Sequence, residues 1–137
     1  MLIRTYVDSG VLIAAARGAG KLAQRALAVI GDTTSREFVC SDYVKLETVP
    51  EPIYFGRAAE VRFYEAYFST AVSWLSFDTT HLENALGEAC RSGLSSLDAI
   101  HVVVAALSGC DELVTSEKAT SAIHRTKLIR VVSIDID

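Results

Sequence analysis

Four acidic residues occupy positions from which they can act together. Asp8 ends an apolar run near the start, Glu47 and Asp98 lie in segments with a helical pattern, and Glu117 follows a late apolar run. Acids gathered in one crevice repel one another and raise each other's pKa unless a cation joins them. Carboxylates with waters are the ligands that a hard divalent ion such as Mg²⁺ or Mn²⁺ prefers. Such an ion activates water and stabilises charge on a phosphoryl group, so the four acids indicate metal-dependent phosphoryl transfer or hydrolysis.

Three of these acids also have a purely structural interpretation, which the sequence leaves open. Asp8 can cap the helix that follows it. Asp98 lies in Ser95-Ser96-Leu97-Asp98, which fits a capping box, and an acid is favourable in the first turn of a helix. Glu117 can be a solvated loop acid.

Glu47 is the most informative of the four because of its helical position. The apolar face of its helix is predicted to hold Tyr43, Val44, Leu46 and Val49, whereas Lys45 and Thr48 are predicted to point away. Glu47 falls within the apolar face. Because an ionised carboxylate is costly to bury without a partner, we expect Glu47 to bind a metal, form a salt bridge or lie at the rim.

The elements that must position these acids alternate between strand and helix. Strands are predicted at 2–7, 37–40, 71–77, 112–115 and 128–134, and helices at 11–16, 21–30, 41–49, 56–68, 79–90, 96–107 and 118–124. The helix at 41–49 is predicted to stop at Pro50 and Pro52. This alternation predicts right-handed crossovers and a parallel, mostly buried sheet that is covered on both faces.

A parallel sheet brings the acids to one edge. Ligands of open parallel sheets bind beyond the carboxyl ends of the strands, where Asp8 and Glu117 are expected. The helix that carries Asp98 must end at the amino edge in order to feed the next strand. Its beginning, with Asp98, is therefore expected at the carboxyl edge.

Composition is typical of one folded domain spanning residues 1–137. Half of the residues are hydrophobic and 22% are charged. We expect a cytoplasmic protein, because no apolar run approaches the roughly 20 residues of a membrane span and the start does not fit a signal peptide. Three cysteines without metal-type spacing are expected to be reduced. The net charge of −4 does not indicate a nucleic-acid binder, unless part of the acidity belongs to a metal site.

Three segments resemble the PIN-domain family, especially the toxin nucleases of the VapC type. They are Tyr6-Val7-Asp8-Ser9-Gly10-Val11-Leu12-Ile13, Ser96-Leu97-Asp98-Ala99-Ile100-His101, and Gly109 to Lys118. The resemblance covers essentially the whole chain. It implies a three-layer α/β/α sandwich around a mostly parallel four- to five-stranded sheet, and endonucleolytic cleavage of RNA at a Mg²⁺ or Mn²⁺ site. Asp8, Glu47, Asp98 and Glu117 would be the metal-binding and catalytic acids. A cognate antitoxin and a homodimer are further implications.

The sequence also departs from the family pattern. Glu117 stands where relatives usually have Asp, Gly10 replaces an often polar residue, and Ala119 replaces a further acid of many relatives. These changes affect the geometry of a second metal position and make an inactive descendant conceivable.

Further polar residues are expected around the acids. Ser9 and Thr115 flank two of them, and their hydroxyls are expected to hold a ligand carboxylate or a water. Lys118 and Arg17 are expected to contact RNA phosphates. Lys21, Arg25, Arg125 and Lys127 are weaker candidates of the same kind, since each singly is more often a solvated charge. His101 is expected to be a hydrogen-bonded core histidine rather than a catalytic one.

Two other functions remain open at this point. A receiver-like phosphoacceptor domain would use Asp78 as the acceptor, with Asp8, Thr115 and Lys118 nearby, but it leaves Glu47 unexplained. A catalytically inactive binding module would keep the fold, with its carboxylates apart or paired to arginine.

Overall fold

Strands and helices alternate along the chain in the computed structural model, which describes residues 1–76 and 78–137. In chain order the elements are β1 (Ile3–Val7), α1 (Ser9–Arg17), α2 (Gly20–Ile30), β2 (Arg36–Ser41), α3 (Asp42–Thr48), α4 (Pro50–Tyr54), α5 (Ala58–Phe68), β3 (Ser73–Leu75), α6 (Thr79–Ser92), α7 (Ser96–Leu107), β4 (Glu112–Thr115), the 3₁₀ helix η1 (Ala122–Arg125) and β5 (Arg130–Ser133).

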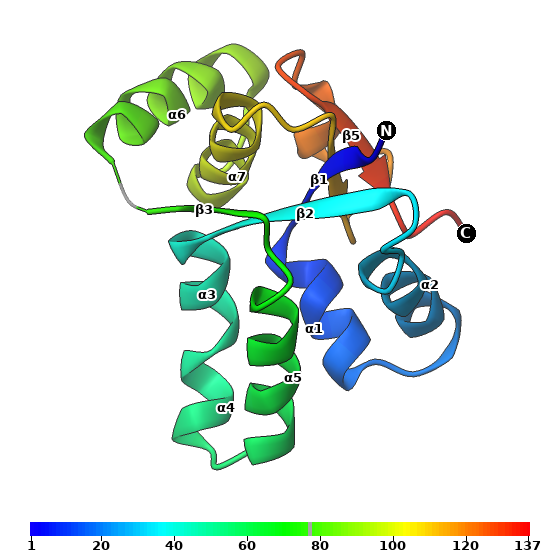
Figure 1. Cartoon of the computed structure of the whole chain (residues 1–137). Coiled ribbons are helices and arrows are strands. Elements are labelled where there is room, and N and C mark those ends of the chain that lie inside the picture. The colour runs from blue at the N-terminus through cyan, green and yellow to red at the C-terminus, as the bar shows by residue number, and fades with distance from the viewer. Residues whose placement is uncertain (77) are drawn as a thin grey trace.

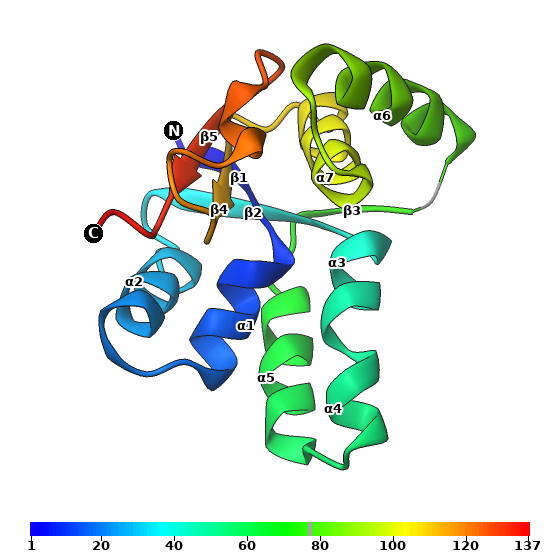
Figure 2. The ribbon, with the colours of Figure 1, turned by 180° about the vertical axis from the view of Figure 1, so that it is seen from behind.

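All five strands form one parallel sheet in the order β3-β2-β1-β4-β5. Figure 1 shows α6 and α7 on one face of this sheet, and α1, α2 and α5 on the other. Seen from behind, the same three layers are visible, and helices α3, α4 and α5 extend away from the sheet (Figure 2). The predicted α/β/α arrangement around a parallel sheet is confirmed.

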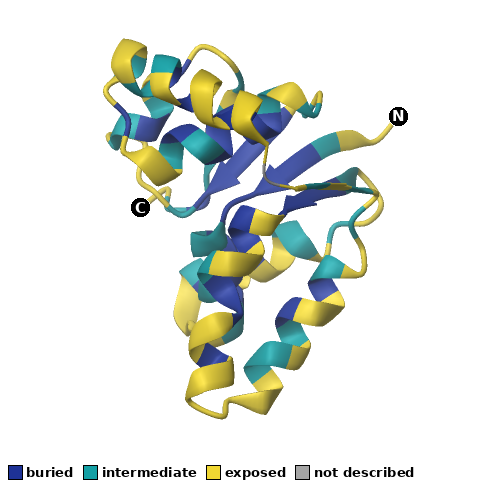
Figure 3. Cartoon of the chain, turned by 90° about the vertical axis from the view of Figure 1, so that its left-hand side faces the viewer, coloured by how far each residue is buried: buried dark blue, intermediate teal, exposed yellow. Residues whose placement is uncertain are grey.

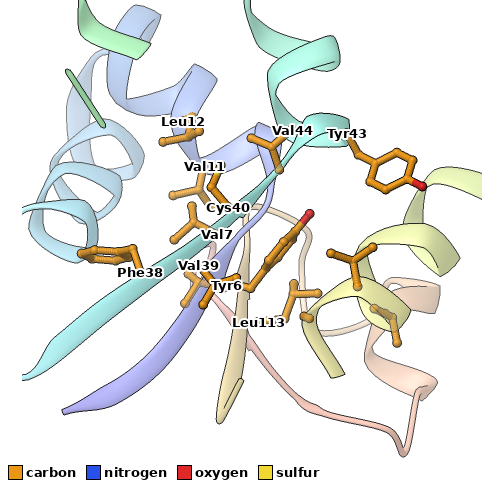
Figure 4. Packing of buried hydrophobic residues seen from close by; sticks show 14 of the residues in the cluster. Tyr6, Val7, Val11, Leu12, Phe38, Val39, Cys40, Tyr43, Val44 and Leu113 are labelled. Atoms are coloured by element: carbon orange, nitrogen blue, oxygen red, sulfur yellow. The ribbon is translucent and has the colours of Figure 1, made fainter. Parts of the chain in front are cut away.

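The core lies on both faces of the central strands. Tyr6 is in register with Val39 of β2 and Leu113 of β4, and all three side chains are fully buried. Figure 4 shows them on the side of the sheet away from Val7 and Phe38, as the alternation of a strand requires. Burying each such side chain contributes about 1.5–3 kcal/mol. The central strands are accordingly dark in Figure 3.

The edge strands are more exposed than the apolar sequence predicts. Trp74, in the middle of β3, is 37% exposed, and β5 contains no fully buried residue. Both strands have a neighbour on one side only. The expected strand 71–77 is also shorter, and its last position, residue 77, lies outside the described residues.

One helix was not predicted, and one predicted helix is absent. α3 ends at Thr48, just before Pro50 as expected, but Pro50 also begins α4, because a proline at the first helical position loses no intrahelical hydrogen bond. The helix expected at 118–124 is absent, and only η1 forms there. Thr120 and Ser121 disfavour a longer helix because their hydroxyls compete for backbone groups.

Within the described residues, no single helix is long and apolar enough to cross a membrane. α6 and α7 meet that requirement only as a pair, with a bend of 115° between them.

Candidate active site

Asp8 lies at the carboxyl end of β1, where the sequence places it. Its backbone N–H donates to the carbonyl of Val114, and its Oδ1 accepts a hydrogen bond from the N–H of Val11, 3.2 Å away, so it caps α1. The side chain is almost fully buried, and this burial raises the pKa of Asp8. A hydrogen bond from Thr115 and the nearby His101 oppose that rise, whereas the charge of Asp98 adds to it.

Asp98 is the residue that connects the four acids. Partial burial raises its pKa, and the negative charge of Glu117 raises it further, with a smaller contribution from Glu47. Asp98 also acts on Asp8, so it lies within electrostatic range of the other three. The capping interpretation is realised as well, since the Asp98 N–H donates to the hydroxyl of Ser95 at 3.3 Å.

Glu117 follows β4 on an exposed loop that the backbone holds in place. Its N–H donates to Oγ1 of Thr115 at 3.1 Å, and its carbonyl accepts hydrogen bonds from Ser133 and His124. The longer arm of this glutamate therefore starts from a fixed backbone position.

Glu47 lies on the inner side of α3, as predicted, although two of its neighbours differ from the prediction. Leu46 is 71% exposed, whereas Thr48 is buried and donates to the carbonyl of Val44. The Thr48 hydroxyl can lie on the buried face because a carbonyl of the same helix accepts its hydrogen bond. The buried face therefore runs through Tyr43, Val44 and Thr48, and Glu47 lies between them.

The partner of Glu47 is His101, which the sequence left as a core histidine. Nε2 of His101 makes a short contact to the Glu47 carboxylate, and Nδ1 lies 2.7 Å from the hydroxyl of Tyr6. The Tyr6 hydroxyl is in turn 2.8 Å from Oγ of Ser41. Burial raises the pKa of Tyr6 well above its ordinary value, so this hydroxyl keeps its proton.

One direction of proton donation satisfies this whole chain. Ser41 Oγ accepts from the N–H of Val44 and donates to Tyr6, and Tyr6 donates to Nδ1 of His101. Nε2 then carries the proton and donates to Glu47. The signal that pointed to His101 was its position three residues after Asp98, on the same helical face. No comparable feature of the sequence pointed to Tyr6, the other hydrogen-bond partner of His101.

The four carboxylates fit a divalent metal in chemistry but are not gathered into a ligand set. Among residues 1–76 and 78–137, no three His, Cys, Asp or Glu side chains are grouped closely enough to hold a metal ion. In the same part of the chain, no lysine or arginine pairs with Asp8, Asp98 or Glu117. Oxygen donors without a cationic partner are the kind that Mg²⁺ or Mn²⁺ takes, and binding would need side-chain rotation.

The flanking residues differ in how they relate to these acids. Thr115 is fully buried and bonds to Asp8, whereas no hydrogen bond from the Ser9 hydroxyl to an acid is seen in the described residues. Lys118 is exposed next to Glu117. The Arg17 guanidinium is paired with Glu60, at 2.7 Å, and with Glu51.

Gly10 packs closely against the loop after β4. A Cβ at residue 10 would lie 2.2 Å from Oγ of Ser116 and 3.5 Å from Oδ1 of Asp8. The absence of the polar side chain that relatives often have here thus leaves room for the loop after β4.

Comparison with solved structures shows the same fold elsewhere. The chain is similar to PAE2754 from Pyrobaculum aerophilum (TM-score 0.60, 22% identity, covering 96% of this chain and 92% of that one). It is also similar to VapBC2 from Rickettsia felis, bound to a DNA fragment from their promoter (TM-score 0.69, 12% identity, covering 96% of this chain and 98% of that one). A third similar structure is FitAcB from Neisseria gonorrhoeae (TM-score 0.66, 14% identity, covering 95% of this chain and 97% of that one).

Sequence comparison gives the family. No curated protein matches the sequence closely enough to count as a relative. The model of the PIN domain matches residues 5–125. This range includes all four acids, His101, the last three residues of β1, and the whole of β2, β3 and β4. The chain therefore belongs to the PIN domain family.

Proposed function

We propose that this chain is a Mg²⁺- or Mn²⁺-dependent endoribonuclease that hydrolyses RNA phosphodiester bonds at Asp8, Glu47, Asp98 and Glu117, here called the carboxylate site. The observation that carries the proposal is the position of Asp98, whose carboxylate is within electrostatic range of the other three. The site lies at the carboxyl edge of a parallel sheet, and PIN domains are generally nucleases.

The four carboxylates would hold the ion, which would supply an activated water and neutralise charge on the phosphate. The chain contributes their positions. Asp8 is fixed by Val11 and Thr115, and its raised pKa reflects a buried charge that a cation would stabilise. His101 orients Glu47 from the core side.

We further propose that the chain is the toxin of a type II toxin–antitoxin pair. VapBC2 and FitAcB, which share its fold, are complexes of a toxin with its antitoxin. The carboxylate site would attract an antitoxin segment that offers Arg or Lys to the unpaired acids. Purification from the native operon should yield a small companion protein, and repeated purification of the chain alone would count against this partner. A homodimer and a cytoplasmic location belong to the same proposal.

A catalytically inactive PIN-fold binding module is the second candidate. Two observations favour it: Glu47 is already paired with His101, and the described residues contain no preformed group of three metal ligands. Crystals soaked in Mn²⁺ distinguish the candidates. Density bridging Asp8 and Asp98 supports the nuclease, whereas an unchanged site supports the binding module.

The structure does not support the receiver-like alternative. In that fold the strand order is 2-1-3-4-5, which sets the third strand beside the first. Here β2 separates β3 from β1, and Asp78 caps α6 through the N–H of Thr80 at 2.7 Å. The proposed acceptor is therefore not beside Asp8.

Cleavage of single-stranded RNA by Asp98→Asn tests the nuclease proposal. Asp42→Asn is the matched control, because Asp42 is also the acid in the first turn of its helix, α3. We expect the parent and the control to cut RNA internally with Mg²⁺ or Mn²⁺ and to stop in EDTA, and Asp98→Asn to be inactive. Cleavage that persists in EDTA, or equal activity in all three proteins, would contradict the proposal.

A further inference from the structure

The connection from β4 to β5 is positively charged in a chain of net negative charge. Residues 118–134 contain four lysines and arginines, Lys118, Arg125, Lys127 and Arg130, and no aspartate or glutamate. The whole chain has 13 basic and 17 acidic side chains, so this concentration of positive charge is local.

Two of these cations lie in a cavity beside the end of α6, here called the basic pocket. Its volume is about 380 Å³, and it is lined by Glu88, Arg91, Ser92, Arg125, Lys127 and Leu128. Arg125 crosses the helix end closely: one of its guanidinium nitrogens lies 2.9 Å from where a Cβ on Gly93 would be. Gly93 has a φ of +66°, a backbone conformation that favours glycine.

A buried carboxylate organises the pocket without neutralising it. Glu88 is 2% exposed and accepts hydrogen bonds from Thr126, Ser92 and Arg91, at 2.5, 2.9 and 3.2 Å. These bonds join α6 to the β4–β5 connection. Glu88 supplies one negative charge against the three positive charges of the pocket.

Arg125 and Lys127 are exposed, and neither forms an ion pair with any residue that the structure describes. Arg91 is paired with Glu88, but its side chain remains 64% exposed. The pocket thus presents guanidinium and ammonium groups to solvent, and such groups are the usual partners of phosphate oxygens.

We propose that the basic pocket binds the phosphate backbone of single-stranded RNA beyond the carboxylate site. The inference rests on the proposed nuclease function. The β4–β5 connection begins at Glu117, and His124, next to Arg125, lies 3.3 Å from the Glu117 carbonyl. Because β4 and β5 are parallel, this connection crosses from the carboxyl edge of the sheet to the amino edge, where Lys127 and Leu128 precede β5. An RNA strand that follows the connection away from the carboxylate site would therefore reach the pocket. The pocket supplies the positive charge that the acidic site lacks.

RNA affinity in EDTA tests this inference without requiring cleavage. The probe is a fluorescein-labelled oligouridine of about 12 nucleotides, within the range of single-strand site sizes. Arg125→Ala/Lys127→Ala is compared with Lys45→Ala/Arg62→Ala, which removes two exposed cations from α3 and α5 that form no ion pair with any described residue. Fluorescence anisotropy gives the Kd across a salt series, and thermal unfolding is recorded for each protein.

Loss of two phosphate contacts should lower the slope of log K against log salt by about 1.4. This corresponds to about 25-fold weaker binding at 0.1 M salt if the two proteins converge at 1 M. The control variant should bind like the parent. Equal weakening in both double variants, or a lower Tm with unchanged affinity, would overturn the inference, because the cations would then act through net charge or on the end of α6.

The failure of this inference and of the proposed function can be told apart. A parent that binds RNA through the pocket but does not cleave it contradicts only the nuclease proposal. A parent that cleaves RNA but whose pocket variant binds normally contradicts only the basic pocket. A parent that does not bind RNA contradicts both.

Discussion

Tyr6 and Tyr67 are both buried tyrosines, but their hydroxyls have different surroundings. The Tyr6 hydroxyl lies between Ser41 and His101, whereas the Tyr67 hydroxyl has no hydrogen-bond partner among the described residues. Tyr6→Phe should lower the free energy of unfolding by about 1–3 kcal/mol, because it leaves buried polar atoms unpaired. Tyr67→Phe should be neutral or stabilising. Urea denaturation of both variants measures the difference, and equal effects would show that the Tyr6 chain contributes no stability.

At the scale of single residues, the sequence predicted positions better than partners. Asp8 and Asp98 were predicted both in capping roles and as parts of one acidic edge. In the structure Asp8 caps α1, Ser95 caps α7 through the N–H of Asp98, and the charge of Asp98 acts on Asp8. Helical periodicity placed Glu47 on the inner face of α3. It did not identify His101 as the partner, because that contact joins residues that are 54 positions apart.

At the scale of elements, Glu88 joins α6 to the β4–β5 connection, and its ionisation gives this contact a pH dependence. Burial by itself raises the pKa of Glu88, but hydrogen bonds from Thr126, Ser92 and Arg91 outweigh it and hold the pKa below the ordinary 4.5. A pKa that folding lowers contributes stability above the unfolded pKa and loses it as the pH falls through the folded pKa.

Glu88→Gln should therefore destabilise the protein at pH 7 by about 1.5–3 kcal/mol, the range for hydrogen bonds to a charged group. This difference should be full above the unfolded pKa of about 4.5, should shrink as the pH falls below it, and should disappear only once the pH is below the lowered folded pKa of Glu88. Denaturant unfolding at pH 7, 5, 4 and 3 measures this convergence. Glu83→Gln, on an exposed part of α6, is the control. A gap that stays constant with pH would mean that Glu88 acts by packing rather than by charge.

The order of the elements was predictable from the alternating pattern, but their ends and edges were not. A proline is compatible with either the end or the start of a helix, so Pro50 did not reveal α4. An apolar strand looks the same in the centre and at the edge of a sheet. Trp74 is therefore exposed for a topological reason that its local sequence does not contain.

At the scale of the whole molecule, the carboxylate site predicts that divalent metal stabilises the fold. A ligand that binds only the native state at 100 times its Kd adds about 2.7 kcal/mol. For a chain of this length, we expect a rise in Tm of about 4 °C per kcal/mol. Thermal unfolding in Mg²⁺ or Mn²⁺ is compared with NaCl of equal ionic strength, because salt alone screens repulsion between the acids. An identical Tm in the two salts would count against a metal site.

Asp8→Asn tests the carboxylate site most directly, with Asp78→Asn as the matched control. Both aspartates cap helices, and asparagine preserves the cap in each case. Cleavage of single-stranded RNA is measured at limiting Mg²⁺, together with the Tm in EDTA. We predict that Asp8→Asn lowers the cleavage rate by about 100-fold or more, the scale of removing one electrostatic contact from an active site. Its Tm in EDTA should match or exceed that of the parent, because burial disfavours the ionised Asp8. Asp78→Asn should cleave like the parent. If Asp8→Asn cleaves RNA as fast as the parent, Asp8 is only a helix cap and the four-carboxylate mechanism is contradicted.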